Sequence, residues 1–494
     1  MIVGVDVGSQ SLKAVVLDDR LRVRGAGRRT YPIVFPRPGW AEQDVHRWEA
    51  ALGPAIAEAL DAAGCAPGAV TALGIAGQLD GCVPVDGDGR SLGPCLIWMD
   101  RRADAALAAV RARISPEALR RRTGANLDGT HMAAKMRWLL DHPPGGRAIA
   151  AFHQPVDYLV ERLTGARAID HGLASTTLVY DLAEGDFADD LLAAFGLRRD
   201  LLPALRRGDE AAGGLSHVGG ALTGLPQGIP VAVGTGDDFA APLGGGVAEP
   251  GIVVNVLGTA EVVGALDPRP LIDSTGLVET HRFPGSGLYF IENPGWVGGG
   301  ALEWLRGLLG IADFAAFDRL AAAAPAGSDG LTFLPALTGA MTPEWIAEAR
   351  GCFYGLTPSH GPGHLARAVL EGTAFGLKDV TGRLRAMGVA VERVRLLGGG
   401  ARSALWARIR AGATGLPVER ARVTDAAAVG AGMLAAVAGG RVVDLAAAAR
   451  LVDAVADTVD PDPANAAAYA DAYDRYRRLF AALKPLFRAL PPAD

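Results

Sequence analysis

Cysteine and lysine are both scarce in this sequence of 494 residues. The four cysteines, Cys65, Cys82, Cys95 and Cys352, form no CxxC pair and are too few for a disulfide scaffold. We therefore expect free thiols in a reducing compartment. None of the few lysines stands in a GxxxxGK[ST] pattern, so the chain has no Walker A loop, and any ATP must be held by backbone clamps.

Basic residues are also fewer than acidic residues. The formal net charge is −6 at pH 7, and no long run of Lys or Arg occurs, which argues against a nucleic-acid partner. No apolar run reaches the roughly 20 residues that span a bilayer, and residues 1–6 enter a strand pattern without the character of a signal peptide. We therefore expect a cytoplasmic protein with no membrane partner.

What the chain does have is enough apolar sequence for more than one core. Half of its residues are hydrophobic and 21% are charged, which is typical of a soluble globular enzyme. At this length we expect two domains of about 250 residues, or three smaller ones.

A glycine-rich stretch near the middle, residues 234–246, is the first candidate for chemistry. It follows an apolar run at 229–233 that predicts a buried strand, and it presents Asp237 directly after two glycines. An acid at the end of such a strand lies at the mouth of a crevice, where α/β proteins bind ligands. An Asp that caps a helix would give the same pattern, so this segment alone leaves both interpretations open.

Residues 2–19 predict a β-hairpin with a Gly8-Ser9 turn and an acid, Asp6, buried in the first strand. Backbone N–H groups and hydroxyls in such a turn form an anion site, and an adjacent Asp can hold a metal. Many hairpins carry Gly-Ser turns without a ligand, so the alternative is a purely structural hairpin.

Residues 251–264 repeat this plan around Gly258-Thr259, with Val256 where the first hairpin has its acid. The repeat predicts two related domains with a boundary near residue 247. Two clamps facing each other across a cleft would hold a polyphosphate, and only one of them would supply a carboxylate for the metal.

Polar residues also end two further predicted strands, as Gln78 and Asp80 in GQLDG and Trp98 in WMDRR. Acids, an amide and an indole suit a polyhydroxylated ligand, although Trp98 could instead be an ordinary core residue. The helical patterns of residues 100–220 suggest no chemistry, and we expect His131 and His153 to make local hydrogen bonds.

Taken together, these motifs resemble those of the FGGY carbohydrate kinases, within the actin/Hsp70/hexokinase-like superfamily, and are most similar to the xylulokinase-like branch. The resemblance covers nearly the whole chain: GVDVGSQSLKAV at 4–15, PGWAEQD at 38–44, GQLDG at 77–81, WMDRR at 98–102, DYLVERLTG at 157–165, GTGDD at 234–238, LGT at 257–259, LPALTG at 334–339, ARGCFYGLT at 349–357, HLARAVLEGTAFGL at 364–377 and LLGGGARSALW at 396–406.

The resemblance implies an α/β fold of two ribonuclease H-like domains, residues 1–246 with the sugar site and 247–494 with the ATP site, around a central cleft. It implies ATP and Mg²⁺ as cofactors and a small sugar as substrate, with Asp237 as general base and Asp6 as the acid associated with the metal. It places ATP contacts at Gly8, Ser9, Gln10, Lys13, Gly258, Thr259, Gly300, Gly399, Gly400 and Ser403, and sugar contacts at Gln78, Leu79, Asp80, Trp98 and Asp238.

Three departures from the family pattern bear on the substrate. Xylulokinases usually read GQMHG where this chain has Asp80, Asp238 replaces a usual amide, and the family's GERTP reads GAMTP at 339–343. We expect a ketopentose kinase, with D-xylulose as first candidate. The alternatives are another ketose or a linear polyol such as glycerol or erythritol, and more remotely a nucleotide-gated sugar sensor without phosphoryl transfer. A homodimer is the candidate assembly.

Overall fold

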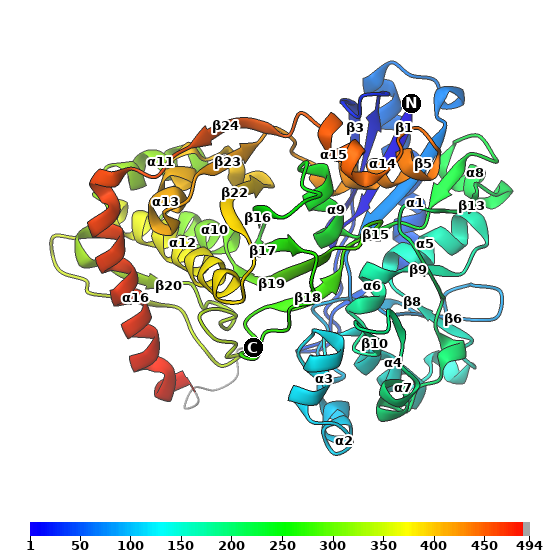
Figure 1. The fold of residues 1–494 in the computed structure, drawn as a ribbon, viewed down its shortest axis with the longest axis horizontal. Helices are drawn as coiled ribbons and strands as arrows, with labels where there is room; N and C mark the ends of the chain where they lie inside the picture. Colours follow the sequence, from blue (N-terminus) through cyan, green and yellow to red (C-terminus); the bar gives the residue numbers. More distant parts are fainter. Residues whose placement is uncertain (488–494) are drawn as a thin grey trace.

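The structure is a computed structural model that describes residues 1–487, and it is built around two seven-stranded sheets. Each sheet is flanked by helices, and the two bodies lie side by side, with the second half of the chain on the left of Figure 1 and most of the first half on the right. No helix among these residues is long and apolar enough to cross a membrane.

The first sheet contains the predicted N-terminal hairpin. The hairpin is confirmed, because β1 and β2 pair antiparallel with Asp6 opposite Lys13, and β1 also runs parallel to β5. The strands, in spatial order, are β13 (Ala211–Gly214), β14 (Pro230–Ala232), β5 (Ala72–Gly77), β1 (Ile2–Val7), β2 (Ser11–Leu17) and β3 (Val23–Thr30), with β15 (Thr235–Gly236) also on β5.

The second sheet contains the other predicted hairpin, formed by β16 and β17, which is likewise confirmed. Its strands, in spatial order, are β18 (Glu279–Arg282), β19 (Tyr289–Val297), β17 (Ala260–Asp267), β16 (Gly251–Leu257), β22 (Val391–Leu397), β23 (Val418–Ala421) and β24 (Val455–Val459). In both sheets the first hairpin strand has its antiparallel partner on one side and a parallel strand on the other. The predicted internal repeat is therefore a repeat of sheet topology.

Short strand pairs and helices complete the two bodies. The pairs are β4 (Glu42–Gln43) with β7 (Cys95–Leu96), β6 (Val83–Val85) with β8 (Ala151–His153), β9 (Ala168–Asp170) with β12 (Ala204–Arg206), β10 (Tyr180–Asp181) with β11 (Asp186–Phe187), and β20 (Thr332–Leu334) with β21 (Cys352–Tyr354). The helices are α1 (Val45–Ala63), α2 (Leu107–Arg111), α3 (Pro116–Thr123), α4 (Met132–Asp141), α5 (Pro155–Thr164), α6 (His171–Ser175), α7 (Asp189–Phe195), α8 (His217–Thr223), α9 (Asp237–Gly244), α10 (Gly299–Leu308), α11 (Phe314–Ala322), α12 (Pro362–Ala386), α13 (Ala404–Thr414), α14 (Ala426–Ala438), α15 (Leu445–Leu451) and α16 (Ala466–Phe487).

Helix α14 packs against the sheet of the other half of the chain, where Figure 1 draws it in orange beside β1 and β5. A Cβ added at Gly74 would lie 1.9 Å from the carbonyl oxygen of Ala431, and one at Gly430 would lie 2.0 Å from that of Ala240. Only glycine at positions 74 and 430 lets these backbones approach each other so closely. The domain boundary between residues 246 and 247 stays a prediction. Helix α14 follows this boundary in the sequence but packs on the sheet that precedes it.

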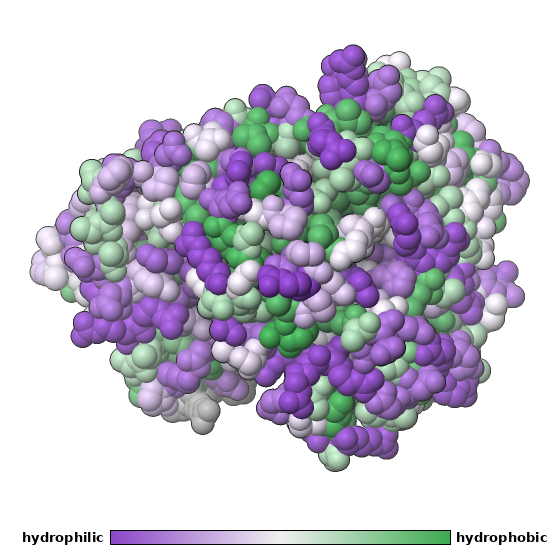
Figure 2. Space-filling view, in the orientation of Figure 1, coloured by the Kyte–Doolittle hydropathy of each residue, from purple (hydrophilic) through white to green (hydrophobic). Residues whose placement is uncertain are grey.

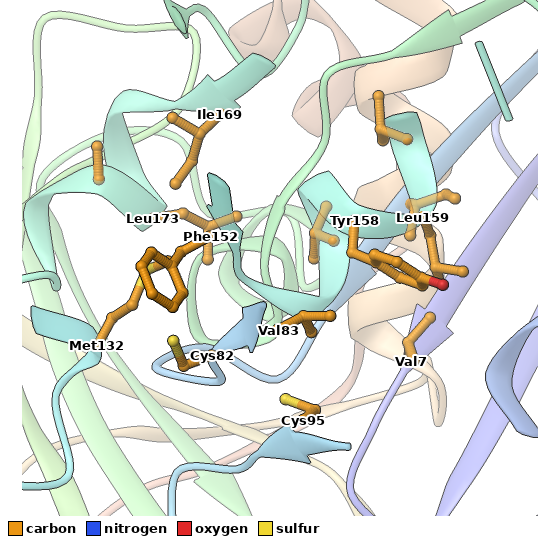
Figure 3. Close-up of a cluster of buried hydrophobic side chains, with 14 of the residues drawn as sticks. Val7, Cys82, Val83, Cys95, Met132, Phe152, Tyr158, Leu159, Ile169 and Leu173 are labelled. Atoms are coloured by element: carbon orange, nitrogen blue, oxygen red, sulfur yellow. The ribbon is translucent and has the colours of Figure 1, made fainter. Parts of the chain in front are cut away.

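The first body has one large hydrophobic core. Figure 3 shows part of it, with Phe152, Met132 and Cys82 in one buried cluster. The four cysteines are free, and Cys82 and Cys95 are buried. On the face drawn in Figure 2, hydrophobic side chains occur in groups that are separated by hydrophilic ones.

Candidate active site

Asp237 is the first residue of α9, directly after the short strand β15. The N-cap is Gly236, and no side chain caps the helix, so the structure does not support the interpretation of Asp237 as a capping residue. Its Oδ1 accepts a hydrogen bond of 3.2 Å from the N–H of Asp238. Burial, together with the carboxylates of Asp238 and Asp6, raises the pKa of Asp237 well above its usual value.

Asp6 lies on β1 within the first hairpin and is 6% exposed. Its Oδ2 is 3.6 Å from Nζ of Lys13, whereas its Oδ1 is buried without a hydrogen-bond partner among residues 1–487. Burial raises the pKa of Asp6, and Lys13 opposes that shift. An unpartnered buried carboxylate oxygen suits Mg²⁺, which takes one or two carboxylates and completes its shell with water and phosphate oxygens. Among residues 1–487, no cluster of three or more His, Cys, Asp or Glu that could hold a metal occurs.

The turn of the first hairpin is fixed by Tyr31, which the sequence analysis did not single out, and by Gln43 of the PGWAEQD motif. The carbonyl of Gly8 accepts a hydrogen bond of 2.7 Å from the Tyr31 hydroxyl, and the carbonyl of Ser9 accepts one from the Gln43 side chain. Gln43 in turn accepts a bond of 2.6 Å from the side-chain amide of Gln78. The PGWAEQD motif thus connects the phosphate turn to the predicted sugar residues.

Gln10 and Lys13 flank the same turn. Gln10 is exposed, and its carbonyl accepts a hydrogen bond of 3.2 Å from Tyr31. Besides Asp6, Lys13 approaches Oδ1 of Asp425, at 3.7 Å, at the start of α14. The lysine therefore lies between carboxylates from both halves of the sequence.

The turn of the second hairpin is held by the start of α10. Gly299 and Gly300 donate backbone hydrogen bonds of 3.1 and 3.0 Å to the carbonyls of Gly258 and Thr259. A Cβ added at Gly299 would lie 2.3 Å from the Gly258 oxygen, so only glycine allows this contact. In both turns, therefore, the backbone carbonyls accept hydrogen bonds from other parts of the protein.

The predicted adenosine segment follows β22, which lies next to β16. Gly398 has a φ of 78°, and a Cβ added at Gly400 would lie 2.7 Å from Cβ of Leu257 in the second hairpin. At Gly399 an added Cβ would meet nothing within 4 Å. The Ser403 hydroxyl accepts a bond of 3.0 Å from the N–H of Trp406 and so caps α13. These contacts place the segment against the second hairpin, which the sequence predicts to bind phosphate.

Asp80 is the most constrained of the predicted sugar residues. It is buried with a φ of 58°, its N–H donates to Gln154 over 2.8 Å, and its carbonyl accepts from Lys135 over 2.7 Å. Its Oδ2 is 3.2 Å from Nδ1 of His131, and its Oδ1 has no partner among the described residues. One carboxylate oxygen is thus held by the protein and the other is left for a ligand.

His131 corrects a prediction from the sequence. The segment of residues 100–220 was expected to carry no chemistry, but this imidazole lies between Asp80 and Glu279, whose Oε1 is 3.8 Å from Nε2. Although burial lowers the pKa of His131, the two carboxylates raise it well above its usual value. His153 does pair locally, with Asp157 at 2.6 Å, as expected.

Strands β18 and β19 contribute three titratable residues that the sequence analysis missed. Nε2 of His281 is 3.6 Å from Oε2 of Glu279 and 3.9 Å from Oε1 of Glu292. Burial raises the pKa of Glu279, but His131 and His281 outweigh it and hold that pKa well below the usual range. Burial and nearby acids, Asp238 first, raise the pKa of Glu292 well above its usual value. The alternation of Glu279 and His281 in the short polar strand β18 was the available signal.

Two of the predicted sugar residues, Asp80 and Asp238, belong to this cluster. Burial raises the pKa of Asp238 to about 7, with His281 lowering it and Asp80 raising it further. The Leu79 side chain lies against Gly236, where an added Cβ would be 2.8 Å away. Trp98 is 39% exposed, so the interpretation of Trp98 as a core residue is wrong. No hydrogen bond or ring contact joins it to this cluster within residues 1–487.

Asp237 is close enough to Asp6, on the first hairpin, and to Asp238, on the polar cluster, for both carboxylates to raise its pKa. Unpartnered acceptor atoms point to what the cluster would bind: Oδ1 of Asp80, Oε1 of Gln78 and Oε2 of Glu292 all lack a hydrogen-bond donor among the described residues. A ligand rich in hydroxyl groups would supply such donors.

Comparison with known proteins gives matches along the whole length of the chain. Residues 1–244 match the model of the N-terminal domain of the FGGY family of carbohydrate kinases, and residues 253–439 match that of its C-terminal domain. A xylulose kinase of Escherichia coli is 32% identical over 490 residues, which cover 98% of this chain and 100% of the relative. A glycerol kinase of Aromatoleum aromaticum is 33% identical over 447 residues, which cover 88% of this chain and 89% of the relative.

The same similarity holds in three dimensions. The crystal structure of xylulose kinase from Rhodospirillum rubrum matches with a TM-score of 0.89 at 32% identity, over 99% of each chain. The predicted α/β fold of two actin-like domains and the predicted resemblance are both confirmed.

Proposed function

The chain belongs to the FGGY family of carbohydrate kinases, and on that premise we propose that it transfers the γ-phosphoryl group of ATP to a hydroxyl of a small sugar, with Asp237 as general base. The observation that carries the proposal is the position of Asp237: it begins α9 and is close enough to Asp6, on the phosphate hairpin, and to Asp238, on the polar cluster, for both to raise its pKa. A phosphoryl acceptor bound at the cluster would lie beside both the base and the phosphate turns.

Phosphoryl transfer depends on positioning and on neutralisation of charge more than on covalent help. The turns at Ser9 and Thr259 would hold the phosphates of ATP, with Lys13 beside them, and Gly399, Gly400 and Ser403 would border the nucleoside. Asp6 fits Mg²⁺, which supplies neutralisation of phosphate charge when bound. Asp237 would accept the proton of the attacking hydroxyl, and its raised pKa makes it a better proton acceptor once it is ionised.

A ketopentose, with D-xylulose first, is the proposed substrate. The similarity to xylulose kinases over nearly the full length supports this choice. A linear polyol is the second candidate, because Asp80 and Asp238 present carboxylates, which pair with hydroxyl donors, and because glycerol kinases are equally similar over a shorter part of the chain. A cytoplasmic location and a homodimer remain predictions.

The experiment is a measurement of sugar-stimulated ADP release with Mg-ATP across D-xylulose, L-xylulose, D-ribulose, L-ribulose, glycerol, erythritol, ribitol and D-gluconate. We expect turnover with one ketopentose to exceed that with all others, and expect Asp237→Ala to lower it by at least about 10²-fold, as for removal of a general base. ATP binding by Asp237→Ala should stay close to that of the wild type.

Each other outcome has a defined meaning. Preference for a linear polyol would move the substrate to the second candidate. Near-normal turnover by Asp237→Ala would remove Asp237 from its role. No sugar-stimulated release with any compound would contradict the proposed reaction and favour the sugar-sensor alternative.

A further inference from the structure

A cavity of about 370 Å³ lies outside the residues described so far. One wall comes from the first half of the chain, including His171 and Arg207, and the other from the end of β18 and the turn that follows it, Arg282 to Gly287. None of its lining residues belongs to either phosphate hairpin or to the cluster around Asp237. It is therefore separate from the proposed active site.

The alternation of side chains along β18 explains this separation. Successive residues of a strand point to opposite faces, so Glu279 and His281 share one face and Arg282 belongs to the other. The first two residues join the polar cluster, whereas Arg282 lines the cavity. One short strand thus serves two different sites.

Arg282 has no acidic partner among the described residues. Its guanidinium donates a hydrogen bond of 3.3 Å to the carbonyl of Leu182 and lies 4.7 Å from the ring centre of Tyr289. Its Nε is buried without a hydrogen-bond partner, and the side chain forms no ion pair within residues 1–487. A half-buried guanidinium group with a buried, unpartnered Nε favours an anion.

The carboxylate in the cavity is already engaged by other groups. Asp170 accepts hydrogen bonds from the N–H groups of Gly172 and Leu173 and from the Thr235 hydroxyl, at 3.0, 2.9 and 2.9 Å. These donors are neutral, and no ion pair joins Asp170 to Arg282 among residues 1–487. The second arginine, Arg207, pairs with Asp209 outside the lining and adds N–H groups at the rim.

We propose that this cavity binds the phosphoryl group of a small phosphate ester or of inorganic phosphate, with Arg282 as its principal contact. Guanidinium groups recognise phosphate oxygens through paired hydrogen bonds, and the cavity volume accommodates an ester of a few carbon atoms. Because its walls come from both halves of the chain, an anion bound there would bridge them. Because Asp170 also holds Thr235, two residues before Asp237, the site adjoins the strand that positions the proposed base.

The test is calorimetric titration of the full chain with inorganic phosphate and, separately, with glycerol 3-phosphate, at constant ionic strength and without ATP or sugar. We expect saturable binding that is weakened at least tenfold by Arg282→Gln. Equal affinity for both probes supports recognition of the phosphoryl group alone, and tighter binding of the ester supports additional contacts to its carbon chain. The readout does not depend on turnover, so it can succeed or fail independently of the proposed function.

Two further variants guard against a folding defect and against binding elsewhere. Gly287 is exposed at the rim, and a Cβ there would meet nothing within 4 Å, so Gly287→Asp adds repulsion without a steric clash and should also weaken binding. Gly87→Asp is the matched control, since Gly87 is equally exposed and open, and it should leave binding unchanged. Full affinity in Arg282→Gln and Gly287→Asp, or loss of binding in Thr259→Val alone, would assign the anion to another site and overturn the proposal.

Discussion

Asp80 shows how a single residue of the site is prepared by its neighbours. Its backbone is held by Gln154 and Lys135, and its Oδ2 is paired with His131, so that Oδ1 remains available. His131 thus acts as a positioning residue for the proposed sugar contact. It is also the residue that joins this loop to Glu279 of the other sheet.

We therefore expect His131→Phe to raise KM for the sugar at least tenfold while KM for ATP stays within about twofold, because the change leaves Asp80 buried without its partner. His131→Gln, whose side-chain amide can still donate a hydrogen bond, should recover part of the loss. His46→Gln is the control, since His46 pairs with Glu49 on the surface. Steady-state kinetics with each substrate varied in turn measures the split, and equal changes in both KM values would mean that His131 has only a structural role.

At the scale of the elements, the second hairpin depends on a buried ion pair beneath it. Glu261 on β17 accepts a hydrogen bond of 2.9 Å from Arg410 on α13, which also donates one to Asn255 on β16, and both charged side chains are fully buried. Burial raises the pKa of Glu261, and Arg410 and Asn255 oppose that shift. Removal of one partner would leave a buried charge without compensation.

Arg410→Met should accordingly lower the free energy of unfolding by about 3–5 kcal/mol, the range for breaking a buried pair. The double variant Arg410→Met/Glu261→Gln should recover part of that loss. In contrast, Arg478→Met breaks a pair with Asp474 that is mostly exposed and should cost less than about 1 kcal/mol. Denaturant titration followed by circular dichroism measures all three, and equal losses in Arg410→Met and Arg478→Met would contradict the importance of the buried pair.

The contrast between this pair and the hairpin above it shows which features could be predicted from sequence. Both hairpins were predicted because a turn of two residues between apolar runs is a short-range signal, and Asp6 could be noticed because an acid is unusual in a buried strand. The pairing of Glu261 with Arg410, or of Asp80 with His131, joins residues far apart in the chain. No spacing rule reports such contacts, and a single sequence carries no record of them.

At the scale of the whole molecule, α14 connects the two bodies. It comes from the second half of the sequence, yet it packs on β1 and β5 and against α9, the helix that begins with Asp237. Its packing partner could not be predicted from the sequence, because the contact depends on how the two halves are arranged. The position of the proposed base therefore depends on a helix nearly two hundred residues further along the chain.

This packing leads to a prediction for one added methyl group. A Cβ at position 430 would lie 2.0 Å from the carbonyl oxygen of Ala240 in α9, and all three nearest atoms belong to the Ala240 backbone, which cannot move aside alone. Gly430→Ala should lower the free energy of unfolding by about 1–3 kcal/mol, the usual cost of overpacking, and should also lower kcat because α9 shifts with Asp237.

Gly382→Ala is the matched control, since Gly382 is exposed on α12 and an added Cβ there would meet nothing within 4 Å. That change should raise stability by about 0.5–1 kcal/mol through helix propensity and leave kcat unchanged. Denaturant titration and steady-state kinetics on both variants provide the check: a destabilised Gly430→Ala protein with unchanged kcat would show that α14 supports the fold without positioning the base.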